Sequence, residues 1–182
     1  MTVKITLSTL TDTATLGLIL AQIYSATDLP PPLLLQGDLG TGKTTLVRYL
    51  VNALPDGRPE DGVEVCSPSF TLCNSYSCIP QVLHFDLYRL AEGALDDNFD
   101  EAVEMSAEGT LLLIVEWPER INKNSLPKEF ILAELTGSGN TRQIIFSSQF
   151  RIKSSEKSCD QFLETLVAAV KREKLPVIVR NI

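Results

Sequence analysis

The stretch GDLGTGKT, residues 37–44, constrains the fold of this 182-residue chain more than any other feature. It fits the pattern G-x-x-x-x-G-K-[ST] in full, and it lies between an apolar segment, LLLQ, and an amphipathic one, TLVRYLVNAL. Glycines at these positions let successive backbone N–H groups close around a phosphate, and the following helix adds the positive end of its dipole. The pattern therefore predicts a buried strand, a phosphate-binding loop and a helix, in that order.

The same motif assigns roles to individual side chains. Lys43 is expected to reach the outer phosphate oxygens, and Thr44 to offer its hydroxyl to a magnesium ion. The expected ligands are therefore ATP or ADP together with Mg²⁺. The residues of the motif that we expect to bind the nucleotide are Asp38, Leu39, Gly40, Thr41, Gly42, Lys43, Thr44 and Thr45.

Two other apolar segments end in a carboxylate. TLLLIVE ends at Glu116, and VLHFD ends at Asp86. A nucleotide site of this type needs a further carboxylate to hold magnesium or its water shell. If both segments are strands in the same sheet as LLLQ, their ends converge on the outer phosphate. We therefore expect Lys43, Asp86 and Glu116 to be catalytic, and Thr44 and Glu116 to hold the metal.

Several of these side chains have simpler explanations that the residues alone leave open. Asp86 is either catalytic or a capping acid paired with Arg89, and Arg89 is either that partner or a cation for the transition state. Glu116 is either the metal ligand or a surface acid. His84, the only histidine, alternates with Phe85 and fits a packed structural residue better than a catalytic base.

The segment SPSFT, residues 67–71, follows a polar loop and is open to two interpretations. In the first interpretation, Ser69 or Thr71 closes on the nucleotide as part of a switch segment. In the second, Pro68 only sets the start of an ordinary strand.

The remaining segments predict a single α/β domain over residues 1–182, of the P-loop NTPase type, with a mixed sheet flanked by helices. Alternation predicts strands in VKITLST, and two hairpins, TLCNSYS with VLHFDLY and EFILAELTG with RQIIFSSQF. Residues 10–25 carry a helical stripe, with Asp12 or Thr13 as its N-cap. Residues 90–108 are expected to be helical in pieces, and SEKSCDQFLETLVAAVKREK is a good terminal helix.

Composition narrows the class of protein. The formal net charge is −7 and the pI is about 4.8, which disfavours independent binding of DNA or RNA. The sequence has no apolar run of about 18 residues and no signal-peptide pattern, so the expected location is cytoplasmic, without a membrane contact. The four cysteines form no CxxC pair, so reduced, mostly buried thiols are expected rather than a zinc site.

Four segments together resemble one family. GDLGTGKTTLVRYL, SPSFTL, HFDLYRL and IVEWPER stand in the same order as in TsaE, formerly YjeE, the small P-loop ATPase of bacterial tRNA threonylcarbamoyladenosine (t6A) synthesis. The resemblance runs from about residue 10 to 121, and GSGNTRQIIFSS shows a weaker similarity. HFDLYRL and EWPER carry most of its specificity, since the phosphate-binding loop alone occurs in many families.

The resemblance implies a function and further site residues. Proteins of this family work with a TsaB–TsaD pair that transfers a threonylcarbamoyl group to adenosine 37 of tRNA, and their slow, Mg²⁺-dependent ATP hydrolysis resets that pair between turnovers. The tRNA is thus reached only indirectly, through the partners. In relatives the EWP glutamate, here Glu116, is a magnesium ligand, and the HFDLYR aspartate, here Asp86, is required for activity. Ser69 matches the family's SP[ST] position, and Arg142 matches an arginine that contacts the nucleotide.

Two other functions on the same core are weaker fits. A small-molecule kinase usually needs an arginine-rich lid, which the sequence lacks. Transfer of phosphate to a small hydroxyl compound would favour the kinase function. A guanine-nucleotide switch would carry NKxD, but NKNS at 122–125 has serine in the fourth place.

Overall fold

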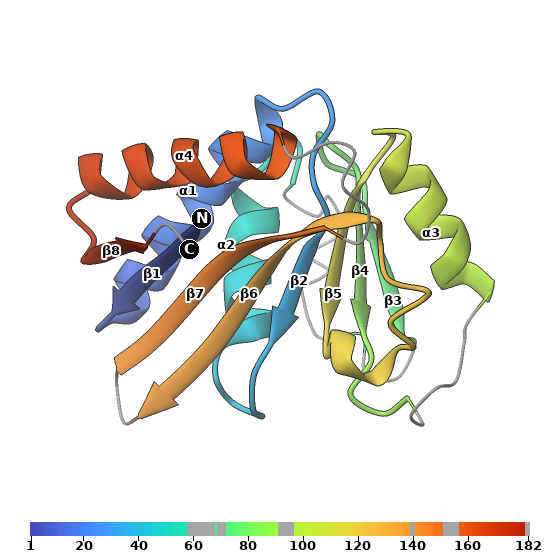
Figure 1. The fold of residues 1–182 in the computed structure, drawn as a ribbon, viewed down its shortest axis with the longest axis horizontal. Helices are drawn as coiled ribbons and strands as arrows, with labels where there is room; N and C mark the ends of the chain where they lie inside the picture. Colours follow the sequence, from blue (N-terminus) through green and yellow to red (C-terminus); the bar gives the residue numbers. More distant parts are fainter. Residues whose placement is uncertain (58–67, 69–71, 91–96, 139–140, 151–156, 181–182) are drawn as a thin grey trace.

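The strands form one eight-stranded mixed sheet in the computed structural model, which describes residues 1–57, 68, 72–90, 97–138, 141–150 and 157–180. The order across the sheet is β3-β4-β5-β2-β6-β7-β1-β8 (Figure 1). The strands are β1 (Thr2–Leu7), β2 (Leu33–Gln36), β3 (Cys73–Tyr76), β4 (Val82–Asp86), β5 (Leu112–Glu116), β6 (Glu129–Ser138), β7 (Thr141–Phe150) and β8 (Val177–Arg180). The helices are α1 (Leu10–Ser25), α2 (Lys43–Ala53), α3 (Asp97–Ala107) and α4 (Lys157–Arg172), with a 3-10 turn η1 (Pro118–Arg120).

The centre of the sheet is parallel and its two sides are antiparallel. Strands β4, β5, β2 and β6 run in the same direction, whereas β3 pairs antiparallel with β4, and β7 pairs antiparallel with β6 and β1. Strands β2 and β5 are apolar until their last residue, as strands buried on both faces should be, and β4 is apolar before Asp86 except for His84. Their carboxyl ends therefore meet at one edge of the sheet, where ligands bind in open α/β folds.

Helices cover both faces of the sheet. One apolar core joins α1, α2 and α4 to the sheet, and a second, smaller core joins α3 to β4 and β5 (Figure 1). Side chains alternate between these cores along β4, because neighbouring residues of a strand point to opposite faces. Val82 belongs to the first core and Phe85 to the second. His84 and Asp86 thus share the face that α2 covers.

The predicted fold class is confirmed, and most of the predicted elements are present with small shifts in their bounds. Of the segment 90–108, which we expected to be helical in pieces, residues 97–107 form the single helix α3, and residues 91–96 lie outside the described residues. The prediction that Asp12 or Thr13 caps α1 was wrong. Thr9 is the N-cap: its hydroxyl accepts a hydrogen bond from the Asp12 N–H at 3.0 Å, and the Asp12 carboxylate accepts one from the Thr9 N–H at 3.0 Å. Asp12 therefore closes a capping box from the third helical position.

The chain after residue 150, whose role the sequence leaves open, completes the sheet. Helix α4 packs on the first core through Phe162, whose ring lies 4.9 Å from that of Tyr24. Strand β8, which we did not predict, pairs antiparallel with β1 at the outer edge. Among the described helices, none is both long and apolar enough to span a membrane.

Candidate nucleotide site

The phosphate-binding loop connects the end of β2 to the start of α2. Gly40 and Gly42 adopt left-handed backbone conformations, with φ of 78° and 101°, which other residues adopt only under strain. Gly42 is the N-cap of α2 and contributes no side-chain cap. The first N–H groups of α2 therefore remain available to an anion, which is how helix N-termini bind phosphate.

Lys43 is folded back along this loop. Its ammonium group donates to the carbonyl oxygens of Gly37 at 2.6 Å and Asp38 at 3.0 Å, and it lies 3.9 Å from the centre of the Trp117 ring. Burial lowers the pKa of Lys43, and nearby carboxylates, chiefly Glu116, oppose that shift. A buried ammonium group beside the loop has the charge and the position to neutralise phosphate oxygens.

Glu116 links the loop to the sheet. Its carboxylate is buried, with Oε2 accepting a hydrogen bond from the Thr44 hydroxyl at 3.0 Å and Oε1 lying 2.9 Å from Nε2 of His84. The interpretation of Glu116 as a surface acid is therefore wrong, since only 1% of the residue is exposed. Buried carboxylates persist where partners compensate for lost water, and functional sites collect such groups.

Asp86 lies directly beside Glu116, because the two residues are paired in the register of β4 and β5. It is also buried, and its Oδ1 accepts a hydrogen bond from the Tyr88 N–H at 3.0 Å. Asp86 thus stabilises the turn that leaves β4, as the capping interpretation expects. This contact engages one carboxylate oxygen and does not decide between the capping and catalytic roles.

Trp117 closes the end of β5 in an unusual conformation. Its φ of 63° is left-handed, which is rare for a bulky residue and marks a strained position. Its N–H donates to the Leu35 carbonyl at 3.1 Å, and its ring lies 5.0 Å from that of Tyr88. Tyr88, just after β4, therefore packs on this tryptophan and links the ends of β4 and β5.

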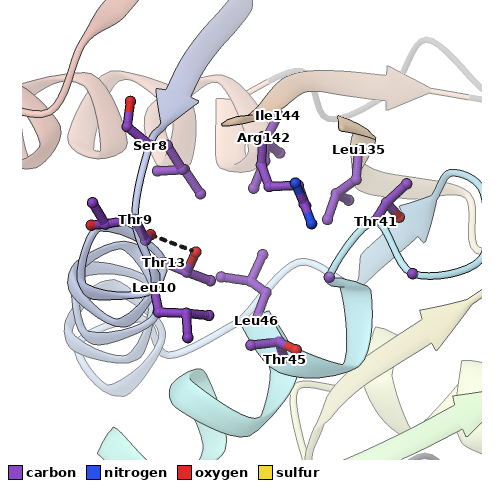
Figure 2. A pocket seen from close by; sticks show the side chains of 13 residues that line it. Ser8, Thr9, Leu10, Thr13, Thr41, Thr45, Leu46, Leu135, Arg142 and Ile144 are labelled. Atoms are coloured by element: carbon purple, nitrogen blue, oxygen red, sulfur yellow. Dashed lines mark hydrogen bonds between the residues drawn. The ribbon is translucent and has the colours of Figure 1, made fainter. Parts of the chain in front are cut away.

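A pocket of about 440 Å³ opens beside the loop (Figure 2). Its apolar side chains are Leu7, Leu10, Leu46, Leu135 and Ile144. Figure 2 shows the Arg142 side chain reaching from β7 toward the loop, opposite Leu46. Polar side chains line it as well, namely Ser8, Thr9, Thr13, Thr41, Thr45 and Arg142. A pocket that mixes apolar walls with polar groups next to a phosphate cradle suits the base and sugar of a nucleotide.

The residues present fit magnesium and a nucleotide. The Thr44 hydroxyl and the Glu116 carboxylate are adjacent hard oxygen donors, and magnesium takes one or two such protein ligands together with phosphates and water. Within the described part of the chain, no group of three or more His, Cys, Asp or Glu is placed to hold a metal alone. A magnesium site completed by a nucleotide matches that donor set.

The structure brings most of the predicted site residues together. Lys43, Thr44, Asp86 and Glu116 gather at the carboxyl edge, while Thr41, Thr45 and Arg142 line or border the pocket. Asp38 and Leu39 form the exposed tip of the loop. Ser69 and Thr71 lie outside the described residues, so both interpretations of that segment stay predictions.

Sequence reasoning missed two parts of the site. The first is the pocket wall from the β1–α1 junction, where Ser8, Thr9 and Leu10 lie. Leu10, the first residue of α1, is 69% exposed in the structure, and no pattern in the sequence indicated that this leucine would line a pocket. The second is Trp117, whose place directly after Glu116 could have indicated a contact with Lys43.

Fold and loop together define a protein of the P-loop NTPase type. The chain belongs to the TsaE family, because the family model described as Threonylcarbamoyl adenosine biosynthesis protein TsaE matches residues 7–144.

Curated relatives agree with the family model. The chain is 35% identical to a Treponema pallidum protein over 124 residues, covering 68% of this chain and 84% of the relative. It is 36% identical to a protein from Nostoc over 147 residues, covering 77% and 82%, and 30% identical to one from Rickettsia conorii over 161 residues, covering 87% and 86%. Each of these relatives is named tRNA threonylcarbamoyladenosine biosynthesis protein TsaE.

A solved structure supports the fold. The crystal structure of Bacillus subtilis YdiB matches 96% of this chain and 97% of its own, with a TM-score of 0.62 at 17% sequence identity. At that identity the match concerns the architecture alone.

Proposed function

We propose that this chain binds and hydrolyses Mg²⁺·ATP as the energy-using component of tRNA t6A synthesis. The observation that carries the proposal is the partly buried hydrogen bond between Thr44, at the end of the phosphate-binding loop, and Glu116, at the end of β5. These are the two side chains that would hold magnesium. Family membership supports the t6A pathway, since the relatives carry that role in their names.

Each group of the site has a distinct part in the proposal. The glycine loop and the N-terminus of α2 bind the phosphates, and Lys43 neutralises their charge. Thr44 and Glu116 hold the magnesium ion, which supplies charge stabilisation at the reacting phosphoryl group. Asp86 orients the attacking water. The base occupies the pocket beside Arg142, against its apolar side chains.

The purpose that we propose for ATP hydrolysis is supported by family membership rather than by the geometry of the site. The acidic chain carries a formal net charge of −7, so it is a poor carrier of tRNA by itself. We propose that a TsaB–TsaD pair performs the transfer to tRNA and that ATP hydrolysis by this chain resets that pair between turnovers.

The nucleotide part of the proposal can be tested by calorimetric titration of the purified protein with Mg²⁺·ATP. Lys43→Ala should weaken binding by roughly 10- to 100-fold, because a hydrogen bond to a charged group contributes about 1.5–3 kcal/mol. Lys171→Ala, which removes an exposed lysine from α4, is the matched control and should bind as the wild type does. Absence of saturable binding, or a preference for GTP over ATP, would contradict the proposal.

A further inference from the structure

We propose that His84 is a positioning residue that holds the Glu116 carboxylate for magnesium. This inference rests on the proposed nucleotide site and adds a residue to it. His84 lies in the middle of β4 and is completely buried. Its Nε2 atom is 2.9 Å from Oε1 of Glu116, while Oε2 of the same carboxylate accepts the Thr44 hydroxyl at 3.0 Å.

The sheet register makes this contact possible. His84 is opposite Ile114, and Asp86 is opposite Glu116. His84 is therefore one diagonal step from Glu116 on the same face of the sheet, a separation that a long side chain can bridge. The carboxylate is thus held from two sides, by β4 through His84 and by α2 through Thr44.

The chemistry of the contact determines which atom carries the proton. An ionised carboxylate can only accept hydrogen bonds, so Nε2 must donate. The other ring nitrogen, Nδ1, is buried without a partner among the described residues. The hydrogen bond to Glu116 therefore orients the imidazole ring. The same hydrogen bond fixes the position of Oε1 of the carboxylate.

Packing alone does not explain a histidine at this position. On the same face, Val82, Leu112 and Ile114 are apolar members of the first core. On β3, the ring of Tyr76 stacks on His84 at 6.4 Å between ring centroids, and the residue paired with His84 is Asn74. An aliphatic residue would fill such a site without burying polar atoms, and burial of an imidazole is costly unless it forms a hydrogen bond. The hydrogen bond that offsets this cost goes to the predicted magnesium ligand, as in sites where an outer partner orients a metal-binding side chain.

The wild-type protein offers a direct test, because the chain contains one histidine. In an NMR spectrum that correlates imidazole nitrogens with their protons, a single ring is observed. We expect Nε2 to be protonated, with a proton protected from solvent exchange, and its signal to shift when Mg²⁺ and ADP are added. An unprotonated Nε2 would overturn the inference, since such a ring cannot donate to Glu116.

Two substitutions test the consequence for magnesium. The quantity to measure is the ratio of the dissociation constants for ADP without and with Mg²⁺. His84→Leu fills the buried space without a donor and should lower that ratio by roughly 10- to 100-fold, the usual cost of losing an outer partner of a metal ligand. His84→Gln, which keeps an N–H near the position of Nε2, should retain most of the ratio.

The outcomes separate this inference from the proposed function. If the wild type binds no ADP, the nucleotide site itself is wrong. If the wild type binds ADP more tightly with Mg²⁺ and His84→Leu keeps the full ratio, the positioning role is wrong. If His84→Leu does not fold, the NMR measurement on the wild type still decides the inference.

Discussion

At the scale of single residues, Asp86 and Glu116 are neighbours with different contacts. Glu116 engages two side chains with its two oxygens, whereas Asp86 accepts the backbone N–H of Tyr88. Both acids are buried at the carboxyl edge of the sheet. We propose that Glu116 holds the metal and that Asp86, its neighbour in the register of β4 and β5, orients the attacking water.

The substitution Asp86→Asn tests whether the carboxylate at the end of β4 takes part in hydrolysis. The amide oxygen of asparagine can still accept the Tyr88 N–H, so the fold and ATP binding should persist. Hydrolysis should fall by roughly 10²- to 10⁴-fold, the usual contribution of a general base. Single-turnover hydrolysis and calorimetric ATP binding measure the two quantities. Asp100→Asn, on the exposed side of α3, is the control. Normal hydrolysis by Asp86→Asn would make Asp86 purely structural.

The capping box of α1 predicts a pH dependence of stability. Hydrogen bonds, first from the Ser8 N–H and then from Thr9, lower the pKa of Asp12 below its ordinary value of 3.8. Because the folded-state pKa is depressed, the stability that this carboxylate contributes is present above pH 3.8 and is lost as the pH falls through the folded-state pKa.

Urea unfolding checks this prediction. Asp12→Ala should be less stable than the wild type at pH 7, and the difference should shrink as the pH falls below 3.8. Thr9→Ala removes the uncharged half of the box and should cost about 0.5–2 kcal/mol at either pH, which makes it the matched control. A difference for Asp12→Ala that does not change with pH would show that its charge has no part in the cap.

At the scale of elements, α1 and α2 touch at a glycine. A Cβ atom at Gly17 would lie 2.5 Å from the Tyr49 Cβ and 3.0 Å from the Leu50 backbone nitrogen. Because α2 begins at the phosphate-binding loop, this close approach places α1 beside the pocket that the loop borders.

Gly17→Ala should therefore destabilise the protein, although alanine is the better helix former by about 1 kcal/mol. Overpacking of this kind costs roughly 1–3 kcal/mol, which exceeds that gain. The unfolding free energy measures the effect. Leu18→Ala, at the next position with 47% of the leucine exposed, is the control and should change stability by no more than about 0.5 kcal/mol. A more stable Gly17→Ala variant would mean that the two helices can separate without loss.

The gathering of Asp86 and Glu116 could be predicted at this scale. Two apolar segments ending in acids and a third ending in the loop predict parallel strands, and the carboxyl ends of parallel strands share one edge. The contact of His84 with Glu116 could not be predicted, because it depends on the register between β4 and β5. The N-cap of α1 was misplaced because Asp12 stabilises the helix from within its first turn.

At the scale of the whole molecule, the pocket depends on the order of the strands in the sheet, which local sequence patterns do not determine. Its walls come from the β1–α1 junction, the loop before α2 and the hairpin of β6 and β7. These segments are far apart in the chain and meet only because β7 pairs with both β1 and β6. Periodicity predicted each element but not this order, and β8 was missed because its four residues pair with β1 from the far end of the chain.

The most direct test of the account is Mg²⁺-dependent ATP hydrolysis by this protein alone and with a matching TsaB–TsaD pair. We expect little turnover alone, clear stimulation by the pair, and loss of the stimulated rate in Asp86→Asn. That result would support an ATPase whose site is organised by its partners. The same rate with and without the pair would contradict the partner-coupled role, and the absence of hydrolysis under both conditions would contradict the ATPase itself.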